Sequence, residues 1–314
     1  MTPKKALITD SVHNILIEDL EAVGYLCTYL PNIQQQEVEK IIAEYEILII
    51  NSKINVDEQF LNKAEKLKYI GRLGSGMEIV DIPYAESKGI KVYNSPEGNR
   101  DAVAEHAISM LLGLFNQLIY ANNEVKNFIW EREQRRGEEL KGKTIGLIGY
   151  GNTGKVMAKK LSGFDVQVLF YDKYLKTEDD KYAKQVNLQD IYNEAEVLSF
   201  HIPYNKETHY YFSEDFINKM KHPFYLINTS RGKVVNTKDL INGLNNKKML
   251  GACLDVFENE KPQTYTNEEK KMYEELFSHK NVIVSPHIAG WTHQSKYKLA
   301  KILSNKILGN AYLD

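Results

Sequence analysis

Cysteine is scarce in this chain, and long hydrophobic runs are missing. The only two cysteines, Cys27 and Cys253, lie far apart in apolar surroundings, so neither a disulfide nor a cysteine-based metal site is expected. The longest apolar run, residues 107–115, is much shorter than the roughly 20 residues that span a bilayer. The first residues lead into a short apolar strand rather than the core of a signal peptide. These absences predict a cytoplasmic protein with no membrane partner and no metal.

An excess of charge of either sign is also missing. The 314 residues include 40 Lys and Arg against 42 Asp and Glu, a net charge of −2, so no strong field would recruit nucleic acid. Hydrophobic residues make up 43% of the chain and charged residues 26%, which is typical of a globular protein with sizeable cores. The length exceeds that of one ordinary domain, so we expect two domains.

Glycine is grouped at one place where a ligand would need it. Residues 144–148 form an apolar, strand-like run that leads into Gly149, Gly151 and Gly154, and a helical pattern follows. In such a turn the first glycine permits the tight bend, the second lets a pyrophosphate approach the backbone, and the third lets helix and strand pack closely. The helix N-terminus then offers N–H groups to the phosphates. The pattern predicts a dinucleotide-binding site.

The next apolar run ends at Asp172, which indicates which dinucleotide binds. Its carboxylate is expected to accept hydrogen bonds from the adenosine ribose. A 2′-phosphate at about 4 Å would be repelled by about 1 kcal/mol in water and about 4 kcal/mol at a partly buried surface, which is roughly tenfold or more in affinity. Lys173 would offset part of this repulsion only by turning toward the phosphate. We therefore predict NAD as the cofactor.

Short strands and helical patterns alternate along the chain, which predicts an α/β fold with parallel sheets. A long helical pattern without proline covers residues 101–130 and suits a connector between domains or a surface for a partner subunit. A last helix is expected at residues 292–308, with room to return to the first domain. Strands are expected at residues 6–9, 26–29, 47–50, 69–73 and 91–93, and then at 144–148, 167–171, 197–200, 224–228, 249–255 and 282–284.

Three polar residues follow strands of the second block, where parallel sheets bind ligands: Arg231, Glu260 and His287. Reduction of a keto group leaves a developing alkoxide, and histidine can supply the proton near neutral pH. A carboxylate on its other nitrogen would fix the tautomer, and the arginine fork can hold a carboxylate through two hydrogen bonds. Asp255, deeper on its strand, would orient a nicotinamide ring. Taken singly, each of these residues could instead be a loop or surface residue.

Together these segments closely resemble the D-isomer-specific 2-hydroxyacid dehydrogenase family over nearly the whole chain. Beyond the glycine turn, the resemblance rests on Gly74-Ser75-Gly76 followed by Asp81, and on Asn94-Ser95-Pro96. It continues with Val103-Ala104-Glu105-His106-Ala107 and with His201-Ile202-Pro203 leading to Glu207-Thr208. The Arg231, Asp255, Glu260 and His287 segments then follow in the family's order.

The resemblance implies two doubly wound parallel-sheet domains. A flavodoxin-like substrate domain would combine residues 1–100 with 292–314, and a central Rossmann NAD-binding domain would cover residues 101–291. A homodimer built on the central domains is also implied. His287 would be the acid/base, Glu260 its partner and Arg231 the substrate anchor, with the backbone of Ser75 and Gly76 on the substrate carboxylate. The residues implied to contact the cofactor, including those of the glycine turn, are Gly149, Gly151, Asn152, Thr153, Gly154, Asp172, His201, Pro203, Thr208, Thr229, Asp255 and Gly290.

The substrate would be a small 2-hydroxy or 2-keto acid, but its identity stays open at this stage. Without a regulatory extension, the 314 residues look most like short D-3-phosphoglycerate dehydrogenases. In that subgroup an arginine usually precedes the serine after the third strand, whereas this chain has Asn51. Lys53, or Arg135 and Arg136 of a partner subunit, could replace it as phosphate ligands. Glyoxylate or hydroxypyruvate reductase is the first alternative, and a non-catalytic, NAD-sensing corepressor-like protein is the second. Formate dehydrogenases pair the histidine with glutamine, so Glu260 argues against them.

Overall fold

The computed structural model describes residues 3–175 and 180–310. The chain divides into two compact units: unit 1 combines Met1–Arg100 with Trp291–Asp314, and unit 2 is Asp101–Gly290. Each unit contains one sheet, and the named strands that pair within it are all parallel. The predicted α/β fold class is therefore confirmed. Residues 311–314 of the predicted first domain lie outside the described residues.

Unit 1 is built on a five-stranded sheet with the order β2-β1-β3-β4-β5, the flavodoxin-like order. Alternate residues of a strand face opposite sides of the sheet. Ala6 and Ile8 therefore pack with α1 and α12 on one face, while Leu7 packs with α2, α3 and α4 on the other. The elements are β1 Lys4–Ile8, α1 Ile15–Ala22, β2 Tyr25–Tyr29, α2 Gln35–Ile41, β3 Ile47–Ile50, α3 Glu58–Lys63, β4 Tyr69–Arg72, α4 Ile82–Ser87, β5 Lys91–Asn94 and α12 His293–Leu308.

Unit 2 is built on a seven-stranded sheet with the order β12-β11-β10-β9-β6-β7-β8. Counted from its own first strand, β6, this is the Rossmann order with one further strand. The elements are α5 Arg100–Phe115, α6 Leu118–Lys126, β6 Thr144–Ile148, α7 Asn152–Leu161, β7 Gln167–Tyr171, β8 Lys184–Gln185, α8 Leu188–Glu194, β9 Val197–Phe200, α9 Glu214–Lys219, β10 Phe224–Asn228, α10 Thr237–Asn245, β11 Met249–Leu254, α11 Asn267–Ser278 and β12 Val282–Val284. Short 3-10 helices are η1 Ile42–Glu44, η2 Pro96–Gly98, η3 Glu133–Arg135, η4 Ser162–Phe164, η5 Gly232–Val234 and η6 Pro262–Thr264.

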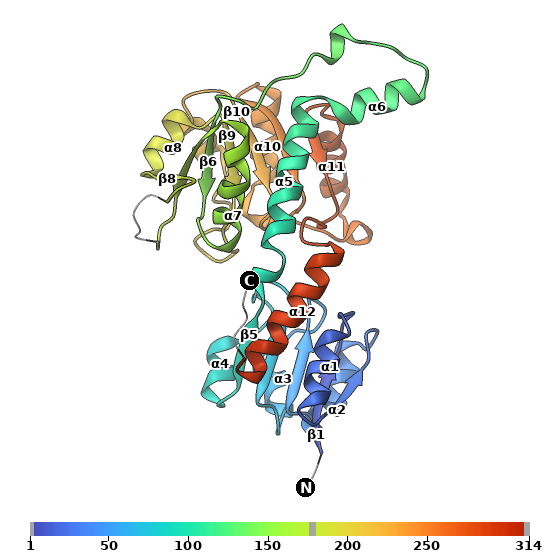
Figure 1. Cartoon of the computed structure of the whole chain (residues 1–314). Helices are drawn as coiled ribbons and strands as arrows, with labels where there is room; N and C mark the ends of the chain where they lie inside the picture. The colour runs from blue at the N-terminus through green and yellow to red at the C-terminus, as the bar shows by residue number, and fades with distance from the viewer. Residues whose placement is uncertain (1–2, 176–179, 311–314) are drawn as a thin grey trace. The chain divides into compact units, whose positions relative to one another are not determined.

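Helices cover both faces of the seven-stranded sheet, so its inner strands are buried on both sides (Figure 1). Ile145 and Leu147 of β6 pack with α5 and α7, whereas Ile148 joins the core under α8, α9, α10 and α11. Burial on both faces explains why these strands read as continuous apolar runs in the sequence.

The parallel register aligns the carboxyl ends of the strands in unit 2. Ile148 pairs with Tyr171 on one side and with Phe200 on the other, and Asn228 pairs with both Phe200 and Leu254. The loops that follow these strands therefore all leave the same edge of the sheet. This edge carries the predicted cofactor and catalytic residues of unit 2.

The single helix predicted over residues 101–130 is wrong, because the chain bends by 63° between α5 and α6. Gln117 has a left-handed backbone with φ of 47°. The carbonyl of Phe115 accepts a hydrogen bond from the N–H of Glu138 at 3.1 Å, so the returning chain takes the acceptor that a continued helix would use. Figure 1 shows α6 and the segment after it extending away from the rest of unit 2. Among the described residues no single helix has the length and hydropathy needed to cross a membrane.

Candidate active site

The glycine turn after β6 divides into two crowded positions and one open position. A Cβ on Gly149, whose φ is 94°, would lie 2.5 Å from the carbonyl oxygen of His201, and a Cβ on Gly154 would lie 2.4 Å from the carbonyl oxygen of Gly149. A Cβ on Gly151 would meet no atom within 4 Å. Two glycines therefore allow close packing of backbone, while the middle one leaves open space beside the turn. This is the arrangement that a pyrophosphate needs.

The helix that follows the turn begins without a side-chain cap. Gly151 is the N-cap of α7 and makes no side-chain cap hydrogen bond, whereas the side chains of Asn187, Asn236 and Thr266 cap α8, α10 and α11. The first N–H groups of any helix have no partner within the helix, and its positive end attracts anions. The start of α7 thus leaves N–H donors available for phosphate oxygens.

Asp172, directly after β7, organises the loop in which it lies. One of its oxygens accepts from the N–H groups of Tyr174 and Leu175 at 3.0 Å each, and the other accepts from the N–H of Tyr150 at 2.8 Å. Burial works to raise the pKa of Asp172, but these three bonds and the charge of Lys155 lower it. A carboxylate has about four acceptor positions, so about one remains for a ribose hydroxyl.

Thr229 and His201 complete the cofactor-side residues at the ends of β10 and β9. The Thr229 hydroxyl is buried and has no hydrogen-bond partner among the described residues, which is unusual because buried polar groups are nearly always paired. His201 Nε2 lies 3.0 Å from Ser199 Oγ, and burial lowers the pKa of this imidazole to about 4. The open glycine, the uncapped helix and the unpaired hydroxyl all fit a bound dinucleotide.

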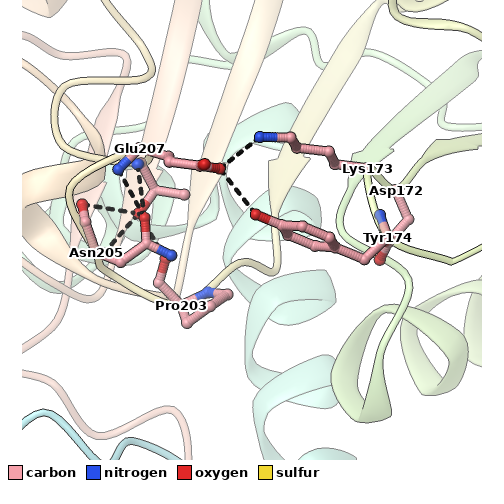
Figure 2. A network of polar contacts seen from close by, with 7 residues as sticks. Asp172, Lys173, Tyr174, Pro203, Asn205 and Glu207 are labelled. Carbon is pink, nitrogen blue, oxygen red and sulfur yellow. Dashed lines mark hydrogen bonds and ion pairs between the residues drawn. The ribbon is translucent and has the colours of Figure 1, made fainter.

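The loop after β9 carries Pro203 and Thr208. Thr208 Oγ1 donates to the Pro203 carbonyl at 2.7 Å, and Asn205 Oδ1 accepts from the N–H groups of Glu207 and Thr208 at 2.8 and 3.0 Å. Figure 2 shows this compact turn facing the loop that follows β7. The two predicted cofactor residues of this loop are therefore held together by local hydrogen bonds.

The predicted acid/base pair forms in unit 2. His287 Nδ1 lies 2.7 Å from Glu260 Oε2, and both side chains remain partly exposed. Burial works to raise the pKa of Glu260, but the hydrogen bond and charge of His287, the N–H of Phe257 and the charge of Arg231 together lower it. The carboxylate therefore stays ionised at neutral pH and orients the imidazole through Nδ1. No partner within the described residues occupies His287 Nε2.

Arg231 reaches this site because Gly232 lets two loops touch. A Cβ on Gly232 would lie 1.9 Å from the carbonyl carbon and oxygen of Phe257, so only glycine fits against the loop that carries Glu260. The Arg231 guanidinium donates to the carbonyl of Ser230 at 2.7 Å, and its charge acts on Glu260. The structure therefore brings Arg231, Glu260 and His287 together at one edge of the sheet.

Asp255 is completely buried and holds the histidine loop. Its carboxylate accepts from Ser285 Oγ at 2.6 Å and from the N–H groups of Ile288 and Ala289 at 2.8 Å each. Its carbonyl accepts from the N–H of His287 at 2.8 Å. His287 has a left-handed backbone with φ of 55°, and these bonds stabilise that conformation. Positioning of this loop is a role that the sequence interpretation of Asp255 missed.

His106 is a second residue whose surroundings the sequence did not indicate. Its Nε2 lies 2.9 Å from Ser285 Oγ and 3.7 Å from Asp255 Oδ1. In the sequence, this residue falls inside the segment that was predicted to form one long helix. One signal for this contact was visible in the sequence: Ser285 directly follows the strand predicted at residues 282–284 and stands two positions before His287.

The remaining predicted residues lie in unit 1, at the end of unit 2 and at the start of α7. Ser75 and Gly76 belong to unit 1, in the turn after β4, where the Ser75 carbonyl accepts from Asn94 Nδ2 at 2.9 Å. Gly290 is the last residue of unit 2 and closes the segment that Asp255 holds. Asn152 and Thr153 are the first two residues of α7.

Comparison with known proteins decides the family. Residues 108–289 match the family model described as D-isomer specific 2-hydroxyacid dehydrogenase, NAD binding domain. The chain belongs to this family. This match confirms the predicted family. It also confirms, for the family as a whole, the predictions of NAD as cofactor and of an NAD-dependent oxidoreductase.

Individual members of the family resemble the chain over most of its length. It is 33% identical to a hydroxypyruvate reductase of Thermotoga maritima over 276 residues, 88% of each chain. It is 32% identical to a D-3-phosphoglycerate dehydrogenase of Synechocystis over 98% of this chain, but spans only about half of that relative, 54%. The crystal structure of a D-lactate dehydrogenase of Aquifex aeolicus with NAD and lactic acid is 30% identical, with a TM-score of 0.83 over 98% of this chain and 96% of that one.

Proposed function

We propose that this chain is an NAD-dependent dehydrogenase that interconverts a small D-2-hydroxy acid and its 2-keto acid. The observation that carries the proposal is the 2.7 Å contact between His287 Nδ1 and Glu260, beside Arg231. It lies at the same edge of the sheet as the open glycine turn. NAD, when bound, supplies or accepts the hydride.

His287 is proposed to move the proton. Reduction of a keto group develops negative charge on its oxygen, and a proton donor there typically accelerates such a step 10²- to 10⁴-fold. With Nδ1 held by Glu260, Nε2 is the nitrogen that faces the substrate in this proposal. An ionised Glu260 stabilises the protonated imidazole, so the pair suits a group that gains and loses a proton in each turnover.

Arg231 is proposed to hold the substrate carboxylate or its polarised carbonyl. The planar fork of its guanidinium fits two oxygens at once. The backbone carbonyl of Arg231 accepts from Asn228 Nδ2 at 3.0 Å, and the next residue, Gly232, packs against the backbone of Phe257. The backbone that bears the guanidinium is therefore well defined before substrate arrives.

The identity of the acid has two candidates. For hydroxypyruvate or glyoxylate, the support is that the predicted phosphate ligands already have partners. Lys53 Nζ donates to the Pro31 carbonyl at 2.5 Å, and Arg135 binds Glu124 and Gln117. We rank these unphosphorylated acids first.

For 3-phosphohydroxypyruvate, one contact provides support. Arg72 Nε donates to the carbonyl of Asn51 at 3.2 Å, so a guanidinium lies beside the position where the subgroup usually has arginine. Initial rates with NADH and hydroxypyruvate, glyoxylate, pyruvate and 3-phosphohydroxypyruvate separate the candidates. A kcat/KM for the phosphorylated acid more than about tenfold above the others would reverse the ranking.

The proposed reaction is tested by His287→Ala. Turnover should fall by roughly 10²- to 10⁴-fold, while NADH affinity changes little. His222→Ala is a matched control, because His222 is exposed and stands before β10, at the opposite end of that strand from the site. Unchanged turnover in the His287 variant, or no turnover of any 2-keto acid by the wild type, would reject the assignment.

We also propose that the protein is a homodimer assembled through the segment of α6 and residues 127–130. This segment exposes large apolar side chains: Phe128 is 98% exposed, Trp130 74% and Leu118 61%. The segment is held at one point by an ion pair, because Arg135 Nε and Nη2 both donate to the Glu124 carboxylate. An exposed apolar surface of this kind is typical of a subunit interface.

A further inference from the structure

Glu207 makes a contact that the proposed reaction does not explain. Its Oε2 accepts from Lys173 Nζ at 2.6 Å and from the Tyr174 hydroxyl at 2.8 Å. Figure 2 shows Lys173 and Tyr174 reaching from the loop after β7 toward Glu207 on the loop after β9. Because β7 and β9 are the two neighbours of β6, this contact joins the two loops that flank the glycine turn.

The contact is weak as a stabiliser of the fold. Lys173 and Glu207 are 57% and 59% exposed, and exposed ion pairs contribute little to folding stability. The hydrogen bonds and charge of Lys173 and the hydroxyl of Tyr174 lower the pKa of Glu207, so the carboxylate is ionised at neutral pH. What the contact does determine is where the charge of Lys173 lies.

Both partners are attached to residues of the predicted adenosine end of the site. Lys173 and Tyr174 directly follow Asp172, and the Tyr174 N–H donates to its carboxylate. Glu207 directly precedes Thr208 and is fixed by Asn205. Lys173 Nζ also lies 5.4 Å from the centroid of the Tyr174 ring, so its charge is held on two sides.

A 2′-phosphate on the adenosine ribose needs a cation to offset Asp172, and Lys173 is the cation nearest to Asp172 in the sequence. Glu207 neutralises that cation, so the net charge of Asp172, Lys173 and Glu207 together stays negative. Lys155, whose charge also acts on Asp172, lies on α7, and within the described residues the partners of the Glu207 carboxylate are Lys173 and Tyr174.

We propose that Glu207 is a coenzyme-specificity residue that excludes the 2′-phosphorylated dinucleotide by holding Lys173. This inference rests on the proposed function, since it concerns the cofactor of the same site. Asp172 alone would disfavour the phosphate, and Glu207 removes the side chain that could compensate. The selectivity for NAD over NADP then depends on two carboxylates from two loops.

The test measures the dissociation constants of NADH and NADPH by fluorescence titration, which needs no turnover. Removing one repulsive charge and releasing one attractive charge should tighten NADPH binding about fivefold or more in Glu207→Gln, with NADH affinity within twofold of wild type. Adding Lys173→Gln to this variant should abolish the gain. Glu194→Gln, an exposed carboxylate before β9 at the other end of that strand, makes the same change of net charge as a control.

Each outcome decides the proposal. A gain in Glu207→Gln that disappears with Lys173→Gln and is absent in the control supports it. An unchanged ratio of the two affinities overturns it, as does an equal gain in the Glu194 variant or a gain that survives the loss of Lys173. Wild-type protein that binds NADH but reduces no 2-keto acid would reject the proposed reaction alone, and protein that binds neither dinucleotide would reject both proposals.

Discussion

The three glycines after β6 allow a sharp separation of folding from cofactor binding. Gly154→Ala places a methyl group 2.4 Å from the carbonyl oxygen of Gly149. Because this oxygen is a backbone atom, it cannot avoid the methyl group by a change of side-chain rotamer. Overpacking of this kind typically costs about 1–3 kcal/mol, and the better helix propensity of alanine returns at most about 1 kcal/mol. We expect the free energy of unfolding to fall measurably in this variant without any cofactor present.

Gly151→Ala is the matched variant in the same turn. Its Cβ meets no atom within 4 Å and its φ of −82° is negative, but its ψ of −149° lies beyond the main extended region, so the loss of stability should be smaller than in Gly154→Ala rather than zero. The methyl group would instead occupy the space through which the pyrophosphate approaches the backbone. Loss of one charge-assisted hydrogen bond costs about 1.5–3 kcal/mol, so NADH affinity should fall about 10- to 150-fold.

Urea unfolding of the free proteins and NADH titration by fluorescence measure the two effects separately. The Gly154 variant should lose stability, and the Gly151 variant should lose NADH affinity with a smaller loss of stability. If Gly151→Ala bound NADH as tightly as wild type, the open position would not be the phosphate site. If it unfolded as easily as Gly154→Ala, the space beside it would not be open in solution.

Three further predictions follow from the site and its surroundings. Arg231→Lys should lower kcat/KM for the keto acid at least tenfold with NADH affinity unchanged, and a near wild-type value would contradict bidentate binding. Because burial lowers the pKa of His201 to about 4, the unfolded state binds more protons between pH 6.5 and 4. The free energy of unfolding should therefore decrease as the pH is lowered from 6.5 to 4, by up to about 3 kcal/mol. In urea titrations His201→Gln should remove this contribution to the pH dependence. The double variant Phe128→Glu, Trp130→Glu should sediment as a monomer whereas Val23→Glu, an exposed control in unit 1, should not; a monomeric wild type would disprove the homodimer.

The parts of the site that the sequence predicted depend on local signals. The strand, the three glycines and the helix after them occupy about 20 consecutive residues, so the pattern and the structure concern the same short segment. Arg231, Glu260 and His287 could be grouped because carboxyl ends of parallel strands share one edge. That rule needs only the strands and their direction, and both were visible as apolar runs.

The parts that the sequence did not predict depend on contacts between distant residues. The helix ends at Phe115 because the N–H of Glu138 takes its carbonyl, and no periodicity within residues 101–130 contains that information. His106 meets Ser285 across 179 positions. The strand β8 has only two residues, Lys184–Gln185, too few to produce an alternating or apolar pattern.

Asp172 and His287, at the carboxyl edge of unit 2, each use bonding positions for fixation and leave about one over. Asp172 uses three acceptor positions on its own loop and keeps about one. His287 uses Nδ1 for Glu260 and keeps Nε2, while the Thr229 hydroxyl keeps its whole capacity. Groups fixed in this way lose little conformational entropy when a ligand arrives. In the proposed reaction, the remaining acceptor of Asp172 and the hydroxyl of Thr229 would serve the cofactor, and Nε2 of His287 would carry the proton to the substrate.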